Sequence, residues 1–412
     1  PILLKPSSDV GSQVIVNGEV RGQMSAAAYF KMKKALIPEI LSAYNSLAET
    51  VDIIVIEGAG SPAEINLKAD DIVNMGLARL VDAPVLLAGD IDRGGVFAQL
   101  YGTVALLEPE ERARIKGLLI NKFRGDVEIL RPGLAMLEEK TQLPVLGVVP
   151  YLKVDIEDED SLSTRLDAGR TVHPLDAAIL RLPHISNFTD FNPLEYLDGV
   201  SLRYAGSVGE LGEPDLIVLP GTKNTMADLS WLRQSGLEAR ILKHAAAGKP
   251  VIGVCGGYQM LGLTVSDPYG VEHGGEMAGL GLLPFSTVFA PEKTRTRVHG
   301  TVPEVGGIFA GLSGQPYEGY EIHMGQTTLG SGAQPFTEIT DSITGVTKQE
   351  GAWQGNVCGS YVHGIFDSEA VVNAVVRALA EAKGITEEMT LSMDFAAFKE
   401  QQYDILADGL RR

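Results

Sequence analysis

A cysteine between glycines is the feature of this sequence best suited to chemistry. Cys255 follows the apolar run Val251–Val254 and stands in a Gly-x-Cys-x-Gly pattern with Gly253 and Gly257. A strand that turns into a helix at such a site pushes the side chain out at the carboxyl edge of a sheet, where unpaired helix N–H groups favour a thiolate. Free cysteines are more often small buried hydrophobic residues, but a plain core strand has no use for glycines packed around a thiol. We therefore interpret Cys255 as a nucleophile for acyl transfer.

The nucleophile needs a base, and two of the seven histidines are candidates. His363 follows the strand-like run 357–362 and precedes a glycine, and His323 lies in the glycine-bounded segment 319–325. Distance along the sequence does not matter to a catalytic pair. We favour His363, although either histidine is equally explained as a hydrogen-bonded residue of a strand.

An acidic residue followed by glycines indicates nucleotide binding in the first half of the chain. Glu57 ends the apolar run 51–57 and is followed by Gly58 and Gly60. A carboxylate at the end of a strand can hold Mg²⁺, and glycine N–H groups can approach phosphates closely. The alternative is that Glu57 is a solvated strand end. We predict that Glu57 contacts the metal and that Gly58 and Gly60 contact phosphate.

Two further apolar runs end in polar residues that would meet Glu57 at the same edge of a sheet. The run 83–90 ends at Asp90, with Asp92 close behind, and the run 115–121 ends at Asn121. We predict that Asp90 joins Glu57 at the metal and that Asn121 contacts the adenine base of a nucleotide.

These residues require elements that bring strand ends together. Short, continuously apolar runs are typical of parallel strands buried on both faces, and they lie at 51–57, 83–90, 115–121, 143–150, 176–183, 215–220 and 249–255. Helical spacing is found at 25–47, 69–80, 95–107, 131–140, 368–383 and 394–410, while 281–364 is β-like. We predict an α/β fold of two domains, each a mainly parallel sheet flanked by helices. The expected division is residues 1–153, an acidic linker 154–173, and residues 174–412.

Composition narrows the classes of function. The 412 residues carry a formal net charge of −19, which weighs against nucleic-acid binding because that function needs a basic surface. No apolar run is long enough to span a membrane, and the first residues lack the plan of a signal peptide. Two cysteines cannot form a disulfide framework, so we expect a cytoplasmic protein. The sequence leaves the oligomeric state open.

The cysteine turn, the run Leu219–Thr225 and the late His363 together resemble the class I-type glutamine amidotransferases. The resemblance implies that Cys255 attacks the side-chain amide of glutamine and that His363 moves the proton. It also implies an oxyanion hole formed by the backbone N–H groups of Gly221 and Gly256.

The first half resembles the dethiobiotin-synthetase-like ATP-binding domain. That domain, fused ahead of a glutamine amidotransferase, is the plan of the cobyric acid synthase family, and similar motifs occur at 1–11, 57–64, 90–97, 121–126 and 219–225. The resemblance implies ATP, Mg²⁺, glutamine and a corrinoid substrate. The implied reaction amidates the b, d, e and g carboxylates of adenosylcobyrinic acid a,c-diamide to give adenosylcobyric acid. Arg93, Arg295 and Arg297 are candidates to bind the carboxylates, and are explained at least as well as solvated surface charges.

Two departures from the family patterns affect the expected activities. The amidotransferases carry His-x-Glu, whereas residue 365 is isoleucine, so we expect a Cys-His dyad without an orienting carboxylate. The ATP-binding domain opens with G-x-x-x-x-G-K-[ST], which has no match here, and Ser7–Ser12 lacks both the leading glycine and the lysine. The chain begins several dozen residues into the family pattern. We therefore expect glutamine hydrolysis without ATP binding by this chain.

Three other functions fit the same residues. A cobyrinic acid a,c-diamide synthase has the same architecture and acts on other carboxylates of the ring, but the motifs above argue against it. A glutaminase that feeds ammonia to a separate synthetase would not need the phosphate loop. A non-catalytic corrinoid- or nucleotide-binding protein would be favoured by a buried, unreactive Cys255.

Overall fold

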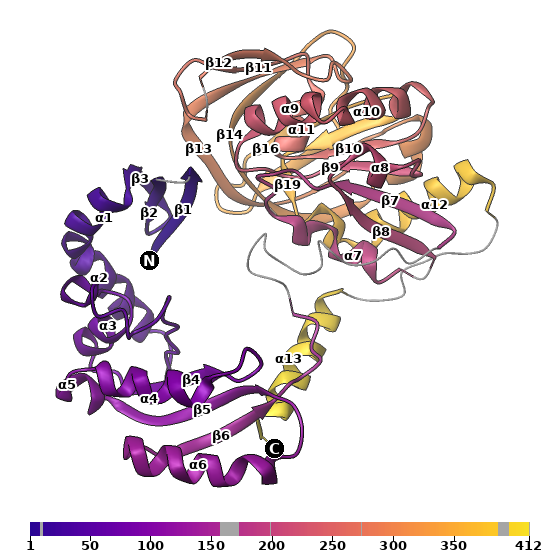
Figure 1. Ribbon diagram of the computed structural model, residues 1–412. Coiled ribbons are helices and arrows are strands. Elements are labelled where there is room, and N and C mark those ends of the chain that lie inside the picture. The colour runs from indigo at the N-terminus through magenta and orange to yellow at the C-terminus, as the bar shows by residue number, and fades with distance from the viewer. Residues whose placement is uncertain (9–10, 157–172, 198, 273, 386–394, 412) are drawn as a thin grey trace. The chain divides into compact units, whose positions relative to one another are not determined.

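Two units make up the part of the chain that the computed structural model describes (Figure 1). The described residues are 1–8, 11–156, 173–197, 199–272, 274–385 and 395–411. The first unit comprises Pro1–Val154 with Gln402–Arg412, and the second comprises Asp155–Gln401. The last residues thus group with the first unit, whereas the sequence-based division places them in the second domain. Most of the predicted acidic linker, 154–173, lies outside the described residues.

The first unit contains a parallel sheet formed by the predicted strand runs 83–90, 115–121 and 143–150. Strands β4 (Val85–Asp90), β5 (Ile115–Phe123) and β6 (Val145–Pro150) lie side by side in that order, all parallel. Helices α4 (Val96–Leu106) and α6 (Val127–Thr141) pack against them, because apolar residues recur along both helices at helical spacing. The other helices of this unit are α1 (Ala26–Met32), η1 (Lys33–Leu36), α2 (Ile37–Ala48), η2 (Lys68–Asp70), α3 (Met75–Leu80) and α5 (Pro109–Arg112).

The run 51–57 does not form a strand, so that prediction is wrong. The run pairs with none of the described strands, and Ile53 and Val55 are 80% and 92% exposed. An apolar run becomes a buried strand only beside a neighbour that takes up its backbone hydrogen bonds. Glu57 therefore lies in a loop and not at the end of a strand.

Residues 2–8 and 11–25 form an antiparallel sheet, which was not among the predicted elements. It consists of β1 (Ile2–Ser8), β2 (Gly11–Val16) and β3 (Glu19–Ser25), with β2 in the middle. Val14 and Val16 are buried together with Leu36. Alternation over so few residues is a weak signal in a sequence.

The second unit is built on a sheet of order β17-β18-β10-β9-β7-β8. All neighbouring strands are parallel except β17 and β18, which confirms the predicted parallel sheet. Every residue of β7, β9, β10 and β18 is buried, as continuous apolar runs require. The strands are β7 (Leu175–Leu180), β8 (Val200–Ala205), β9 (Leu216–Leu219), β10 (Val251–Val254), β17 (Ala352–Gln354) and β18 (Val357–Ser360).

A second, mostly antiparallel sheet accounts for the β-like part of the sequence. Its main order is β12-β11-β13-β14-β19, and β15 joins β13 and β16. Strand β19 continues from β18 and pairs with β14, with Tyr320 opposite His363, so the two sheets adjoin at this point. The strands are β11 (Thr264–Asp267), β12 (Gly275–Ala278), β13 (Phe285–Thr301), β14 (Pro316–Leu329), β15 (Thr337–Asp341), β16 (Thr347–Glu350) and β19 (Val362–His363).

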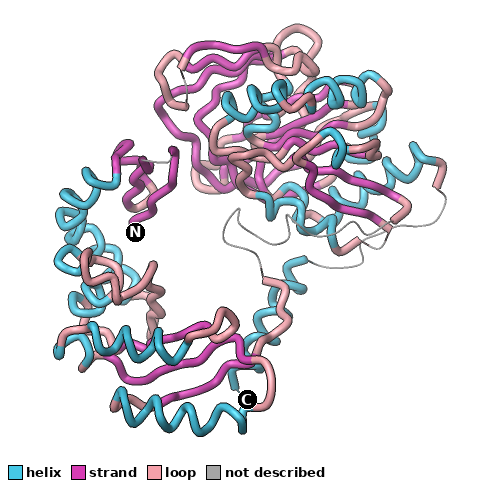
Figure 2. Tube along the Cα trace, viewed as in Figure 1, coloured by secondary structure: helices cyan, strands magenta, loops and turns pink. Residues whose placement is uncertain are grey.

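Helices accompany the two sheets of the second unit (Figure 2). They are η4 (Phe188–Phe191), α7 (Asn192–Glu195), α8 (Val208–Leu211), α9 (Thr225–Gln234), α10 (Leu237–Ala246), α11 (Gly256–Leu261), η5 (Gly307–Leu312), η6 (Ile365–Asp367) and α12 (Glu369–Lys383). The chain closes with α13 (Phe395–Arg411), which together with α12 confirms both helices predicted there. Among the described residues, no helix combines the length and the apolar character needed to cross a membrane.

Candidate active site

Cys255 occupies a strained turn between β10 and α11. Its backbone has φ 51° and ψ −109°, an uncommon conformation for a residue with a side chain. The residue keeps 8% exposure, and Sγ lies 3.7 Å from the carbonyl oxygen of Ile322. This is the geometry of a nucleophile elbow.

The glycines around Cys255 are needed for space. A Cβ at Gly257 would overlap the carbonyl oxygen of Leu219, and a Cβ at Gly253 would lie 2.8 Å from the backbone nitrogen of Tyr258. Helix α11 therefore runs close against the end of β9. The left-handed backbone belongs to Cys255 itself, and the glycines let the helix come close enough to hold it.

Four segments that follow strands of the parallel sheet bring the candidate residues to one edge of that sheet. Asp190 lies in η4 after β7, Gly221 follows β9, Cys255 follows β10, and His363 lies just beyond β18. These strands are parallel neighbours, so their carboxyl ends meet at the same edge. The pairing order thus gathers residues that are far apart in the sequence.

His363 is the histidine that contacts Cys255. It is hydrogen-bonded to the Cys255 side chain, and its Nδ1 donates to Oδ2 of Asp190 at 2.7 Å. Burial by itself lowers the pKa of His363, but the negative charges of Asp190 and Cys255 outweigh burial and raise the pKa to about 10. The imidazolium is therefore favoured, as a thiolate–imidazolium pair requires.

His323, the competing histidine, makes other contacts. One ring nitrogen, Nδ1, donates to the carbonyl oxygen of Gly325 at 2.8 Å, and the other lies 3.4 Å from Oε1 of Glu321. Its ring stacks on Tyr361 with 3.7 Å between ring centres. These contacts are those of a hydrogen-bonded strand histidine.

A carboxylate is present where the sequence predicted none. Ile365 is buried, as an apolar residue should be, but Asp190 contacts the histidine from a position 173 residues earlier in the chain. The expectation of a dyad without a carboxylate is therefore corrected. One signal was available in the sequence: Asp190 follows the apolar run 176–183, as Cys255 follows another.

The proposed oxyanion turn at Gly221 is held by its neighbours. Ser186 N–H donates to the Gly221 carbonyl oxygen at 2.8 Å, and Thr222 Oγ1 donates to the buried carboxylate of Asp228. A Cβ at Gly256 would lie 3.1 Å from the backbone nitrogen of Thr222. The turn thus adjoins the first N–H group of α11, which has no carbonyl partner within its own helix.

In the first unit, Asp90, the last residue of β4, lies opposite Asn121, which is two residues before the end of β5. Oδ2 of Asp90 accepts a hydrogen bond from Nζ of Lys122 at 2.9 Å, and this contact lowers the pKa of Asp90. Oδ1 of Asn121 accepts from the N–H of Lys122, a residue in the left-handed region with φ 61°. The structure therefore brings Asp90 and Asn121 together as expected.

The loop after Glu57 is fixed by Asn74. Asn74 Nδ2 donates to the carbonyl oxygen of Ala59 at 2.8 Å, and the Ala59 N–H donates to Asn74 Oδ1 at 3.1 Å. A Cβ at Gly58 would overlap that Oδ1, and Gly60 has φ 67°. Glu57 is exposed. The described residues contain no group of three or more His, Cys, Asp and Glu arranged to hold a metal ion.

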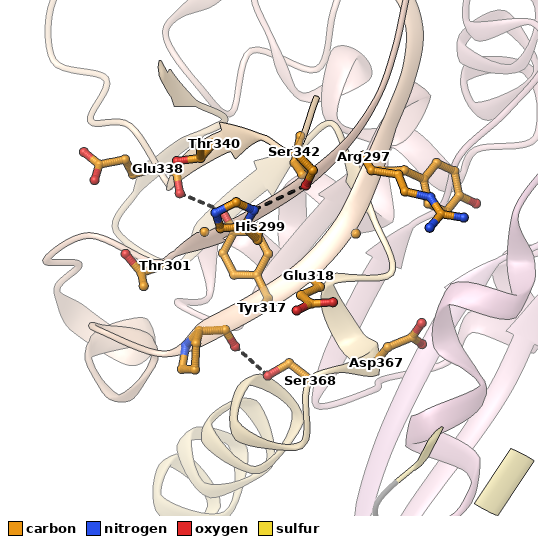
Figure 3. A pocket seen from close by; sticks show the side chains of 15 residues that line it. Arg297, His299, Thr301, Tyr317, Glu318, Glu338, Thr340, Ser342, Asp367 and Ser368 are labelled. Carbon is orange, nitrogen blue, oxygen red and sulfur yellow. Dashed lines mark hydrogen bonds between the residues drawn. The ribbon is translucent and has the colours of Figure 1, made fainter. Parts of the chain in front are cut away.

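The three candidate arginines are exposed. Arg93 lies in the loop after β4, and Arg295 and Arg297 lie on β13. Arg297 lines an open hollow of about 1170 Å³ that also contains three carboxylates, those of Glu318, Glu338 and Asp367 (Figure 3). This excess of negative charge opposes the binding of a polycarboxylate at Arg297.

Comparison with known proteins places both units in families. Residues 176–371 match the CobB/CobQ-like glutamine amidotransferase domain, and residues 23–157 match an AAA domain. All of the chain aligns with a cobyric acid synthase of Ruminiclostridium cellulolyticum at 57% identity, over 80% of that protein. It aligns likewise with cobyric acid synthases of Lachnoclostridium phytofermentans (57% identity, 82% of that protein) and Photorhabdus laumondii (50% identity, 81% of that protein).

The cysteine elbow on a parallel sheet, joined to an AAA-type domain, defines a glutamine-hydrolysing amide ligase. Enzymes of this class free ammonia from glutamine in one domain and couple it to a carboxylate with the other. The chain belongs to the cobyric acid synthase family, and it carries out an amidation in cobalamin biosynthesis.

Proposed function

We propose that this enzyme amidates the b, d, e and g carboxylates of adenosylcobyrinic acid a,c-diamide and gives adenosylcobyric acid, with nitrogen drawn from glutamine. One observation carries the proposal: Cys255 is paired with His363 in a chain 57% identical, over its full length, to a cobyric acid synthase. Both cysteines are free, which supports a reducing, cytoplasmic compartment.

Ammonia is released at the Cys255 elbow. The thiolate attacks the side-chain amide carbon of glutamine, and the carbon–nitrogen bond breaks as His363 gives its proton to the departing ammonia. The N–H groups of Gly221 and Gly256 hold the oxyanion while it exists. Water then hydrolyses the glutamyl thioester and frees glutamate.

The first unit is proposed to activate the carboxylate, because a carboxylate oxygen leaves badly when ammonia attacks. ATP supplies the activating phosphoryl group in this class of enzyme. The donors fit a magnesium nucleotide, since protein Mg²⁺ sites use one or two carboxylates together with phosphate oxygens. The proposed contacts are Glu57 and Asp90 for Mg²⁺, Gly58 and Gly60 for phosphates, Asn121 for adenine, and Arg93 for a corrin carboxylate.

The two cysteines provide a matched test. Cys255→Ala should abolish glutamine-dependent amidation and spare amidation with added ammonia, whereas Cys358→Ala, at a buried position of β18, should spare both. Mass spectrometry of the corrinoid product tells amidation at b, d, e and g from amidation at a and c. Equal loss of the glutamine and ammonia reactions in Cys255→Ala would contradict the assignment.

A further inference from the structure

The Asp190 carboxylate accepts hydrogen bonds from the ring of His363, the proposed base, and from the backbone just after it. Asp190 Oδ2 accepts from His363 Nδ1 at 2.7 Å, and its other oxygen accepts from the Gly364 N–H at 3.2 Å. The two contacts fix the position of the imidazole and the direction in which the chain leaves it. A residue that served only to fill space would need neither.

The pair is shielded from water. The His363 side chain is 1% exposed and that of Asp190 is 5% exposed. An ionic hydrogen bond in so dry a place is stronger than one at the surface. It also keeps the ring from turning, because a rotated imidazole would leave a buried carboxylate without its partner.

The segment that carries Asp190 also holds the face of the ring. Tyr320 stacks on His363 with 5.2 Å between ring centres and 21° between ring planes. Asn187, which precedes η4, donates a hydrogen bond from Nδ2 to the Tyr320 hydroxyl. The turn from Asn187 to Asp190 therefore holds the edge of the His363 ring directly, through Asp190. It holds the face of that ring indirectly, through Tyr320.

The charges around His363 come from the elements packed on it. Asp190 lies on η4, Cys255 at the elbow, and Tyr320 on β14, while Asp367 lies beside Gly364, with Oδ2 3.4 Å from where a Cβ of Gly364 would be. Burial raises the pKa of Tyr320 to about 12, so this hydroxyl stays neutral at physiological pH. Asp190 is the carboxylate in direct contact with the ring.

We propose that Asp190 is the orienting carboxylate of the glutaminase site, a positioning residue that keeps Nδ1–H of His363 on itself and leaves Nε2 for Cys255. This inference rests on the proposed roles of Cys255 and His363. When the thiol proton moves to Nε2, the imidazolium forms beside an ionised Asp190, which stabilises it and keeps no proton. The same proton later leaves Nε2 with ammonia as the carbon–nitrogen bond breaks.

The test combines turnover with the reactivity of the thiol. In a Cys358→Ala background, Asp190→Asn and Asp190→Glu are compared for glutamine hydrolysis and for the pH dependence of Cys255 alkylation by iodoacetamide. We expect Asp190→Asn to lower kcat by about 10²–10⁴-fold with little change in KM. Its alkylation profile should move to higher pH, since the imidazolium that supports the thiolate loses its counter-charge. Asp190→Glu should fall between this variant and the parent.

A matched control separates orientation from folding. Asp176→Asn removes another buried carboxylate of the second unit, one paired with Arg203 at 2.7 Å and remote in sequence from the elbow. It should lower thermal stability and leave the alkylation profile unmoved. Rates are expressed per folded molecule, and if Asp190→Asn does not fold, Asp190→Glu decides.

Two outcomes overturn the inference. One is an Asp190→Asn enzyme whose kcat falls only with its folded fraction while the profile stays in place. The other is an Asp190→Glu enzyme with the parent's kcat and profile where Asp190→Asn cannot be made. Failure of the proposed function would look different, because Cys255→Ala would then still hydrolyse glutamine.

Discussion

The candidate residues at the carboxyl edges of the two parallel sheets differ in burial and in their hydrogen-bond partners. In the second unit, Cys255, His363 and Asp190 are all buried and are linked to one another by hydrogen bonds. In the first unit, Asp90 keeps 32% of its side chain exposed and is paired with Lys122, and Glu57 is exposed. Buried charges must find protein partners, whereas exposed ones are satisfied by water. The glutaminase edge is therefore preformed, and the other edge presents groups that a ligand would have to gather.

The largest expected effect separates the two candidate histidines, His363 and His323. His363→Gln should lower glutamine hydrolysis by about 10²–10⁴-fold, because the thiol loses its proton acceptor. His323→Gln should retain most activity, since its contacts are with Gly325, Glu321 and Tyr361. Steady-state ammonia release measures both variants. Similar losses in the two would remove the distinction drawn between these histidines.

A pair of glycines compares packing in the two units. Gly257→Ala places a Cβ on the Leu219 carbonyl oxygen, so we expect a loss of about 1–3 kcal/mol or more in unfolding free energy and a displaced elbow. Gly102→Ala, in α4 of the first unit, meets nothing within 4 Å and should be neutral or stabilise by up to about 1 kcal/mol. Denaturant unfolding measures both changes. A harmless Gly257→Ala would show that the close approach of α11 to β9 is not required.

Asp90→Asn tests whether the carboxyl edge of the first unit's parallel sheet contributes little to stability. Its ion pair with Lys122 is exposed, so unfolding free energy should change by less than about 1 kcal/mol. Ammonia-dependent amidation should nevertheless fall and require more Mg²⁺, while glutamine hydrolysis measured alone stays the same. A fall in stability comparable to that of a core substitution would place Asp90 among the structural residues.

The smallest effect concerns pH and the second unit. Burial raises the pKa of Glu272 from about 4.5 to about 7, although its Oε2 accepts the Met226 N–H at 3.0 Å. The folded state therefore binds the proton more tightly than the unfolded state. Stability from this group should fall as pH rises from about 4.5 to about 7, then level off. Glu272→Gln should flatten that part of a thermal-unfolding series, and an unchanged slope would contradict the raised pKa.

Much of the fold could be predicted from the sequence, because strands buried on both faces are continuously apolar. The continuously apolar runs that became β7, β9 and β10 have no exposed face and could be recognised one at a time. The run 51–57 shows the same pattern, yet it is not a strand. A strand also needs an adjacent strand that takes up its backbone hydrogen bonds. The residues of the run do not show whether such a strand lies beside it.

The candidate site shows the same limit. Cys255 could be recognised because the glycines beside it are local consequences of a tight turn. Asp190 could not be assigned, because its contact with His363 depends on the order in which the strands pair. The His-x-Glu pattern places the carboxylate two residues after the histidine, where this chain has Ile365. The chemistry required a charge near the ring in space, and the loop after β7 supplied it.

The pairing of β19 with β14 also sets the time at which activity can appear during translation. Cys255 leaves the ribosome about a hundred residues before His363, and the base reaches the thiol only when β19 docks beside Tyr320. A nascent chain that has made its elbow thus carries a cysteine without a proton acceptor. Hydrolysis of glutamine at this site therefore requires that β19 has been synthesised and has paired with β14.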